Sequence, residues 1–329
     1  METENVIIIG GGPAGYTAAL YTARADLKPL AIEGFAWGGL LQQTTDVENY
    51  PGYRDGVLGP EMMQEFRDQA ERFGTRFVTD DVTKVELGDG GVHRVWVGDE
   101  EHRARAVILA MGAQHKTIGC PGEEELGGRG VSYCATCDAA FFREHETIIV
   151  GGGDSAMEEA IFLAKFAKRV TVVHRRRDFR ASKIMLERAR AVENIEFLTP
   201  YVVEVFLPGE NGALDRVRLR DTETGEEEER EITGAFIAVG HEPQSEIVRG
   251  QVQTDDEGYV VTQGKSTRTD VKGVFAAGDL VDHTYRQAVT AAGSGCQAAL
   301  DAEWYLRDEP PMPEEHWAPA ATIKQSIEA

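Results

Sequence analysis

The sequence is poor in three features that define large classes of protein: long apolar runs, positive charge and cysteine. No apolar run in the 329 residues reaches the roughly 18–20 residues that a membrane-spanning helix requires. The opening residues 1–5 carry no basic region or cleavage site, which argues against a secretory signal. The 34 basic residues against 56 acidic ones leave no basic face for nucleic acid or an anionic membrane. We therefore expect a cytoplasmic protein with neither of those partners.

The formal charge of −22 has two interpretations. One is ordinary solubility, since net charge speaks to solubility and not to fold. The other is adaptation to high salt, where repulsion between carboxylates is screened. Activity that rises with molar salt would support the second interpretation, and full activity in dilute buffer would exclude it.

Only four cysteines are present, and two of them, Cys134 and Cys137, form a C-x-x-C pair. In a reducing compartment such a pair is more often catalytic or metal-binding than structural. A zinc site normally takes four ligands, but Cys120 and Cys296 lie far from the pair, and no histidine pair follows at ligand spacing. We therefore expect no metal, and we expect Cys120 and Cys296 to pack as small apolar residues.

The chain opens with a strand-like run, residues 6–9, followed by G-x-G-x-x-G at Gly10, Gly12 and Gly15 and a predicted helix over 16–25. In this setting the first glycine permits a tight turn, the second lets a pyrophosphate approach, and the third allows close helix–strand packing. The phosphates would then lie at the helix N-terminus. On its own, this motif is weak evidence for a nucleotide-binding site.

A second copy of the glycine motif strengthens the evidence for nucleotide binding. Residues 147–150 are again strand-like and lead into G-x-G-x-x-A, with Gly151, Gly153 and Ala156, and a helix to about residue 165. In each copy a polar residue follows 18 positions after the last motif residue: Glu33 in the first and His174 in the second. The matched spacing predicts two nucleotide-binding units.

The strand ends predict which nucleotide each unit binds. Glu33 offers a carboxylate to a ribose with a free 2′-hydroxyl. His174, Arg175, Arg176 and Arg177, with Arg180 beyond them, form a basic cluster that suits a 2′-phosphate, so the second unit is predicted to bind NADPH. The alternative is a solvated basic turn.

The layout predicts an α/β fold with two Rossmann-like, three-layer ββα nucleotide-binding domains, one inserted in the other. Buried-strand runs ending on glycine at 107–112 and 236–240 place the domains at 1–114 with 246–329, and at 115–245. The crossings near 113–119 and 241–247 would form a hinge. A proline-rich tail, flexible or docking, follows from Glu309.

Late in the first domain, Asp279 ends a predicted buried strand, where a carboxylate is costly without a partner. The polar chain of a flavin would supply one. A predicted helix over 285–306 carries small residues on one side, which suits close approach of its N-terminus to a flavin. An alanine-rich core helix would explain those small residues but not Asp279.

The C-x-x-C pair lies just before the second nucleotide motif, hence on the inserted domain. At a helix start such a pair suits reversible dithiol–disulfide exchange. Asp138 follows directly and is a candidate proton donor; its alternative role is a helix cap.

These motifs resemble the low-molecular-weight thioredoxin reductases of bacteria and archaea, over nearly the whole chain. The resemblance rests on Tyr133-Cys134-Ala135-Thr136-Cys137-Asp138, on residues 10–15, 44–52, 151–156, 174–180 and on 273–287. It implies FAD, NADPH, a homodimer and thioredoxin as the protein substrate. It also implies that Cys137 faces the flavin, that Cys134 attacks thioredoxin, and that Asp138 is the acid.

The expected cofactor contacts are numerous. For FAD they are Gly10, Gly12, Pro13, Ala14, Gly15, Glu33, Gly34, Gly39, Leu40, Leu41, Asn49, Gly112, Gly278, Asp279, Arg286, Gln287 and Ala288. For NADPH they are Gly151, Gly153, Asp154, Ser155, Ala156, His174, Arg175, Arg176 and Arg180.

Three positions depart from the family pattern. Ala139 stands where glycine is frequent, Leu40 where glutamine is, and Met111 where threonine is. These changes leave the redox residues in place but put the fine tuning of the flavin in doubt.

The predicted path runs from NADPH to FAD, to the cysteine pair and to thioredoxin. NADPH and the pair share one domain, so the inserted domain is expected to rotate. A reductase serving a glutaredoxin-like or peroxidase partner would share every motif. A ferredoxin–NADP reductase lacks the pair, and a nucleotide-sensing or scaffold protein would bind NADPH without bleaching a flavin.

Overall fold

The computed structural model describes residues 3–44, 46–88 and 91–307, and the predicted tail from Glu309 lies outside these ranges. The described residues divide into two compact units: unit 1 contains those up to residue 114 and from residue 242 onward, and unit 2 contains residues 115–241. The return to unit 1 falls four residues earlier than the sequence predicts. Gln244 already belongs to unit 1, because its backbone N–H donates to the Gly112 carbonyl at 2.9 Å.

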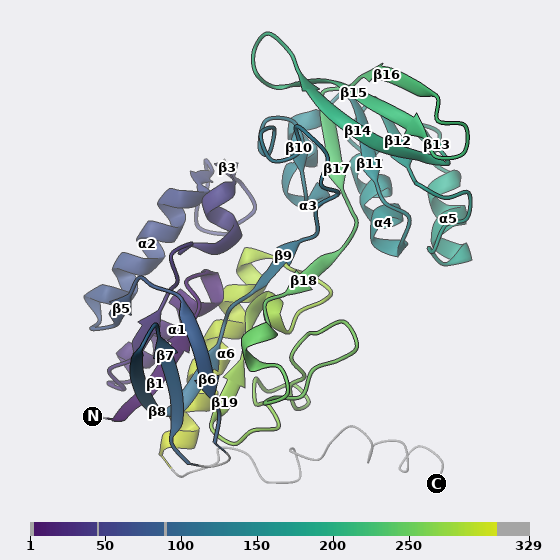
Figure 1. Cartoon of the computed structure of the whole chain (residues 1–329). Coiled ribbons are helices and arrows are strands. Elements are labelled where there is room, and N and C mark those ends of the chain that lie inside the picture. The colour runs from purple at the N-terminus through teal and green to yellow at the C-terminus, as the bar shows by residue number, and fades with distance from the viewer. Residues whose placement is uncertain (1–2, 45, 89–90, 308–329) are drawn as a thin grey trace, which may run out of the picture. The chain divides into compact units, whose positions relative to one another are not determined.

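Unit 1 is built on a mainly parallel sheet in the order β5-β2-β1-β8-β7-β6, with β19 also paired to β8 (Figure 1). Its strands are β1 (Thr3–Ile9), β2 (Leu30–Ile32), β5 (Arg76–Val78), β6 (Val82–Glu86), β7 (His93–Val97), β8 (Glu100–Leu109) and β19 (Val274–Ala276). Strand β8 pairs with two strands along one edge: its first half is antiparallel to β7, and its second half is parallel to β19. A short antiparallel pair, β3 (Asp46–Val47) and β4 (Val57–Leu58), lies apart from this sheet.

The apolar run of β1 is buried on both faces, as a central parallel strand requires. Val6 and Ile8 pack in one core with α1 (Pro13–Arg24) and α6 (Ala288–Leu306). Ile7 and Ile9 pack in the other core with β6 and β7. Helix α2 (Gly59–Arg72) and the short 3₁₀ segments η1 (Gly39–Gln43), η3 (Glu246–Val248) and η4 (Gly278–Leu280) complete the unit.

Helix α6 begins three residues later than predicted. Asp282 accepts the backbone N–H groups of Thr284 and Tyr285 at 2.8 Å and that of Arg286 at 3.0 Å, which holds this segment in a turn. Gln287 then caps the helix. The predicted small residues bring α6 close to α1: a Cβ on Gly295 would lie 2.1 Å from the Ala14 carbonyl oxygen.

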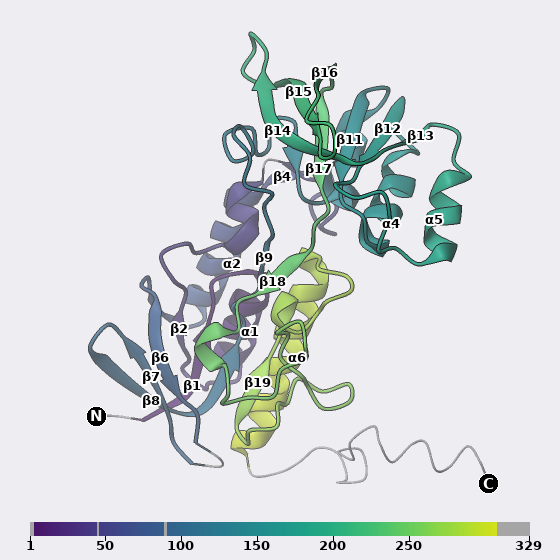
Figure 2. The same cartoon turned by 45° about the vertical axis from the view of Figure 1, so that its right-hand side comes forward.

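Unit 2 repeats the arrangement on a parallel sheet in the order β10-β17-β11-β12-β13 (Figure 1). Figure 2 shows β17, β11, β12 and β13 from a second direction. Its strands are β10 (Val131–Ser132), β11 (Glu146–Val150), β12 (Arg169–Val173), β13 (Ile195–Leu198) and β17 (Gly234–Ile237). One core joins the sheet to α3 (Ala135–Asp138), α4 (Asp154–Leu163) and α5 (Lys183–Arg190), with η2 (Ala139–Phe142) beside them. The opposite core joins it to the antiparallel strands β14 (Tyr201–Pro208), β15 (Leu214–Asp221) and β16 (Glu227–Glu231).

Each unit is therefore a helical layer, a parallel sheet and an antiparallel layer, and the predicted α/β fold class is confirmed. The chain passes between the units twice, in β9 (Ala113–His115) and β18 (His241–Pro243), which pair with each other. None of the helices within the described ranges is long and apolar enough to span a membrane.

Candidate active site

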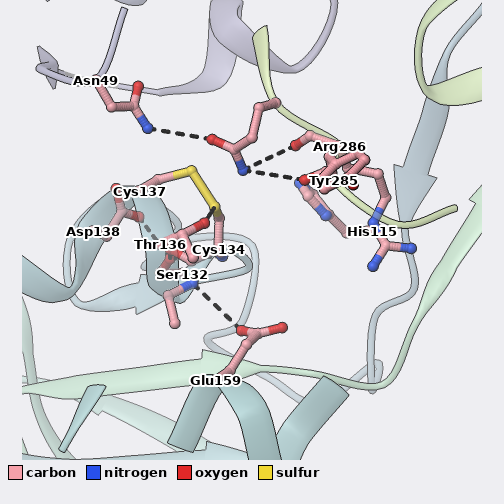
Figure 3. The surroundings of a disulfide bond; sticks show 12 residues. Asn49, His115, Ser132, Cys134, Thr136, Cys137, Asp138, Glu159, Tyr285 and Arg286 are labelled. Atoms are coloured by element: carbon pink, nitrogen blue, oxygen red, sulfur yellow. Dashed lines mark hydrogen bonds between the residues drawn. A yellow bond between two sulfur atoms is a disulfide. The ribbon is translucent and has the colours of Figure 1, made fainter. Parts of the chain in front are cut away.

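The Cys134–Cys137 pair forms a disulfide at the start of α3 in unit 2 (Figure 3). Cys134 is the N-cap residue, and its carbonyl oxygen accepts the backbone N–H groups of Cys137 at 3.2 Å and Asp138 at 3.1 Å. The helix turn thus closes the two-residue spacer and brings the sulfur atoms together. Helix α4 supports this turn, since Glu159 accepts the Ala135 N–H at 3.4 Å.

Asp138 ends α3 with its carboxyl group turned toward the base of the disulfide loop. Ser132 Oγ donates to its Oδ2 at 2.6 Å, and burial raises the pKa of Asp138 despite this bond. The side chain forms no cap bond to the following 3₁₀ turn, so the alternative role as a helix cap finds no support. A carboxyl group with a raised pKa beside a disulfide is suited to proton transfer with a thiol.

The first glycine motif in unit 1 forms an open cradle at the N-terminus of α1. A Cβ on Gly10 would lie 2.2 Å from the Ala110 carbonyl oxygen, and one on Gly15 would lie 1.9 Å from the Gly10 carbonyl oxygen. At Gly12, by contrast, a Cβ meets no described atom within 4 Å, so a ligand can approach the backbone. Pro13 and Ala14 begin the helix above it. This arrangement fits the pyrophosphate of FAD.

Asp279 is a second feature of unit 1 that fits a bound flavin. It lies in η4, just past the strand end predicted for it, and its Oδ1 is buried without a hydrogen-bond partner among the described residues. Burial and the neighbouring Asp282 raise the pKa of Asp279 to about 6. A hydroxyl donor from the polar chain of a flavin would satisfy this oxygen.

Other predicted FAD residues lie in loops and short elements of unit 1. Asn49 Nδ2 donates to Gln287 Oε1 at 3.4 Å, and the Gln287 amide in turn donates to the Tyr285 and Arg286 carbonyl oxygens (Figure 3). Ala288 is the first residue of α6. The remaining predicted positions are Gly34, Gly39 and Gly112, which have positive φ angles, Leu40 and Leu41 in η1, and Gly278 in η4.

Glu33 lies at the predicted strand end, but its carboxylate is already held by protein groups. Tyr16 donates a hydrogen bond at 2.8 Å, Thr79 donates another, and Arg67 Nε donates at 3.0 Å. Only 1% of the Glu33 side chain is exposed. The sequence predicts that Glu33 contacts the ribose of FAD. The hydrogen bonds that the structure describes for its carboxylate come from α1, from α2 and from the segment after β5, all in unit 1.

We therefore expect Glu33→Gln to act first on stability. The change leaves Arg67 without its buried counter-charge, which should lower the free energy of unfolding by about 2 kcal/mol. Arg67 Nη1 also lies 3.9 Å from Oε2 of the exposed Glu71. Glu71→Gln is the matched control, with an expected loss of about 0.3 kcal/mol. Urea unfolding of the flavin-free protein measures both, and equal losses would contradict the prediction.

The second glycine motif forms a similar cradle at the N-terminus of α4. A Cβ on Gly151 would lie 2.4 Å from the Ala238 carbonyl oxygen and 2.7 Å from Ala156 Cβ, whereas one on Gly153 meets no described atom within 4 Å. Asp154 and Ser155 open the helix, and the Asp154 carboxylate accepts the Ser182 N–H at 2.6 Å at the start of α5. The space fits the pyrophosphate of NADPH.

The basic cluster after β12 divides into three parts. His174 is buried and stacks on Phe179, and burial lowers its pKa. Arg177 bonds Glu223 through two nitrogens, at 2.8 and 2.6 Å. The predicted NADPH residues Arg175, Arg176 and Arg180 are exposed, which leaves their guanidinium groups accessible to a 2′-phosphate.

The middle glycines of both motifs were missed by sequence reasoning. A Cβ on Gly11 would lie 2.9 Å from Glu33 Cβ, and one on Gly152 would lie 2.3 Å from the His174 ring. In each unit the middle glycine therefore makes room for the strand-end residue. The signal was present in the sequence as G-G-G in both copies.

The three departures from the family pattern have ordinary surroundings. Ala139 has φ −56°, which any residue adopts, Leu40 lies in η1, and Met111 packs against the core of unit 1. Cys120 and Cys296 are thiols, both half-buried, and burial raises the pKa of Cys120 to about 12. The described residues contain no cluster of side chains that could hold a metal ion.

The model of the family described as pyridine nucleotide-disulphide oxidoreductase matches residues 4–295. The chain is 61% identical to a thioredoxin reductase of Mycolicibacterium smegmatis, over 93% of this chain and 97% of the relative. It is 57% identical to a thioredoxin reductase of Streptomyces clavuligerus, over 93% and 94% of the two chains.

Solved structures give the same result. The thioredoxin reductase of Streptococcus pyogenes MGAS5005 matches with a TM-score of 0.87 at 42% identity, over 93% of this chain and 98% of that one. The thioredoxin reductase of Giardia duodenalis matches with a TM-score of 0.88 at 38% identity, over 93% and 100%.

Proposed function

This chain belongs to the thioredoxin reductases of the pyridine nucleotide-disulphide oxidoreductase family, and we propose that its Cys134–Cys137 pair is the group that reduces thioredoxin. The observation that supports this most directly is the disulfide at the start of α3 with the half-buried carboxyl group of Asp138 beside it. When bound, FAD supplies two-electron transfer between NADPH and this disulfide.

The residues of the chain have separate tasks in this reaction. The Gly12 and Gly153 cradles hold the two pyrophosphates, and Arg175, Arg176 and Arg180 select NADPH over NADH. In the reduced pair, Cys134 attacks the thioredoxin disulfide, one sulfur of thioredoxin leaves as a thiolate, and a mixed disulfide forms. Cys137 then attacks Cys134, which releases reduced thioredoxin and restores the enzyme disulfide. Asp138 donates the proton that a leaving thiolate needs.

The direct test is NADPH oxidation by the flavin-loaded enzyme with and without a bacterial thioredoxin. We expect turnover that depends on thioredoxin, and far slower turnover with NADH. A glutaredoxin and a thiol peroxidase serve as alternative acceptors. Turnover with either of these but none with thioredoxin would refute the proposed substrate while leaving the dithiol chemistry intact.

We also propose that unit 2 rotates relative to unit 1 during turnover. Unit 2 carries both the disulfide and the NADPH cradle, whereas the residues assigned to FAD lie on unit 1, so two groups of one unit must take turns at one cofactor. The passages β9 and β18 form a narrow two-stranded connection. Gly112 and Gly240 next to them have positive φ angles of 71° and 107°.

Covalent cross-links between the two units should therefore lower steady-state turnover at least tenfold. The same reagent in a monofunctional form is the control, and peptide mapping identifies preparations whose links join residues of different units. Exchange between the prereduced pair and a small aromatic disulfide should be unaffected, since it needs no rotation. Full thioredoxin turnover in the cross-linked preparation would contradict the proposal.

We further propose a homodimer in the cytoplasm. The dimer follows from the family resemblance, and sedimentation of the flavin-loaded protein as a 36.1 kDa monomer at micromolar concentration would contradict it. The compartment follows from the chemistry, because a working dithiol and two additional thiols are maintained most readily under reducing conditions. Cell fractionation tests it.

A further inference from the structure

Ser132 is a buried hydroxyl that contacts both ends of the redox loop. It ends β10, and only 6% of the residue is exposed. Its Oγ donates to Asp138 Oδ2 at 2.6 Å and accepts the Cys134 backbone N–H at 3.1 Å (Figure 3). One side chain therefore connects the acid to the residue that carries the attacking sulfur.

The position of Ser132 is fixed by the sheet and not by the loop. Strand β10 pairs in parallel with β17, with Ser132 opposite Phe236, which is fully buried. Strand β10 is the two-residue edge strand of this sheet, and its pairing with β17 involves no residue of the redox loop. Ser132 thus gives Asp138 and Cys134 a common contact on the sheet.

The hydroxyl can also follow the protonation of the acid. While Asp138 is ionised, the Ser132 hydrogen points to its Oδ2. When Asp138 carries a proton, its own O–H can donate to Ser132 Oγ, and the Ser132 hydrogen can turn to the Cys134 carbonyl oxygen, 3.5 Å away. The bond between the two side chains is kept in both states, with donor and acceptor exchanged.

We propose that Ser132 is a positioning residue for the dithiol reaction, holding the Asp138 carboxyl group against the Cys134 backbone and adjusting to the proton on that carboxyl group. The proposal rests on the proposed function, in which Asp138 is the acid. The bond from Ser132 stabilises the ionised carboxylate and so opposes the rise in the pKa of Asp138 that burial causes.

Few other titratable groups face this loop. The packed helix α4 contributes Glu159, which accepts the Ala135 N–H, and the loop itself contributes Cys134 and Cys137, which titrate only when reduced. Beyond these, the interactions that the structure describes for Asp138 are burial and the Ser132 bond. Replacing Ser132 by alanine therefore removes the one side-chain hydrogen bond that the described residues give the Asp138 carboxyl group.

The test is the pH profile of thioredoxin reduction by prereduced enzyme, measured by stopped flow. A required acid makes the rate fall as pH rises through its pKa. Ser132→Ala removes a charge-assisted bond from the ionised form and only a weaker neutral bond from the protonated form, so this alkaline limb should move upward by about one pH unit. Ser132→Thr keeps a hydroxyl on a strand residue and should restore the wild-type limb.

Thr147→Val is the matched control, because Thr147 is also buried in this unit and its hydroxyl donates to the Arg169 carbonyl oxygen at 2.9 Å, away from the loop. The alkaline limb of its pH profile should coincide with that of the wild type. The proposal is overturned if Ser132→Ala leaves the limb in place, if Ser132→Thr shifts it as far as alanine does, or if Thr147→Val shifts it equally.

A second measurement separates this proposal from the proposed function. The carbonyl stretch of protonated Asp138, isolated as an infrared difference against Asp138→Asn in the oxidised enzyme, titrates without thioredoxin. Its midpoint should rise by about one pH unit in Ser132→Ala. If the wild type reduces no thioredoxin, the proposed substrate is refuted, but the infrared midpoints still decide the role of Ser132.

Discussion

Replacing either Cys134 or Cys137 by serine should lower thioredoxin-dependent NADPH oxidation by roughly a thousandfold or more, because thiol–disulfide exchange needs both sulfurs. The binding cradles of both units lie outside the changed residues. Bleaching of the flavin by NADPH in a single turnover should therefore persist. The two assays together separate loss of the dithiol from loss of a cofactor.

The two serine variants should differ in what they trap. With Cys137→Ser, Cys134 can still attack thioredoxin, but the mixed disulfide cannot be resolved, so a covalent complex should accumulate. With Cys134→Ser no such complex is expected. The opposite pattern would reverse the roles assigned to the two cysteines.

Cys120→Ser is the matched control for loss of a cysteine in the same unit. Burial raises the pKa of Cys120 to about 12, so it stays a thiol at neutral pH and takes no part in exchange. Its turnover should equal that of the wild type. Thioredoxin-dependent turnover that survives both Cys134→Ser and Cys137→Ser would refute the central proposal.

Asp279→Asn should weaken FAD binding by about tenfold, because asparagine replaces a hydrogen bond to a charged acceptor with a weaker one to a neutral acceptor. The buried Oδ1 of Asp279 has no partner among the described residues, and a flavin hydroxyl would donate to it. Fluorescence titration of the flavin-free protein with FAD measures the affinity. Unchanged affinity would contradict the assignment of Asp279 to the flavin.

The same change should stabilise the flavin-free protein. Burial raises the pKa of Asp279 from 3.8 to about 6, a shift that corresponds to roughly 3 kcal/mol. Because the folded-state pKa is the higher one, stability is greatest below about pH 4 and falls as pH rises through about 6. Asparagine removes the charge, so the variant should be more stable than the wild type at pH 7.5 but not at pH 4.

Asp301→Asn is the control with the opposite sign. Asp301 is also buried in unit 1, but it accepts hydrogen bonds from the Thr267 N–H at 2.9 Å and the Thr267 hydroxyl at 2.8 Å. Its replacement should destabilise the flavin-free protein and leave FAD affinity unchanged. Urea unfolding at the two pH values distinguishes the variants.

Sequence reasoning succeeded where the signal is local or repeated. The two glycine motifs and the C-x-x-C pair each occupy a few consecutive residues, and the duplicated spacing to Glu33 and His174 predicted the paired units. The family and the fold class followed from these features and are confirmed.

Sequence reasoning could not reach features that depend on side-chain direction, and the predicted contact between Glu33 and FAD stays a prediction. Glu33 is bonded by Tyr16, Arg67 and Thr79, which come from three separate segments, and strand periodicity does not tell which way a terminal side chain turns. The start of α6 was placed too early because Asp282 can hold three backbone N–H groups in a turn, which the alanine-rich pattern after it conceals. The Ser132–Asp138 bond joins a strand to a helix six residues on and leaves no periodic trace.

The packing of the His174 ring on Gly152 affects how the enzyme could be engineered to use NADH in place of NADPH. Because the ring is buried against the glycine and Phe179, replacing it would disturb the loop that cradles the pyrophosphate. Arg175, Arg176 and Arg180 are exposed beside it and can be exchanged without altering that packing. If the three arginines select NADPH as we propose, a designer seeking an NADH-driven variant should mutate the arginines and keep the histidine.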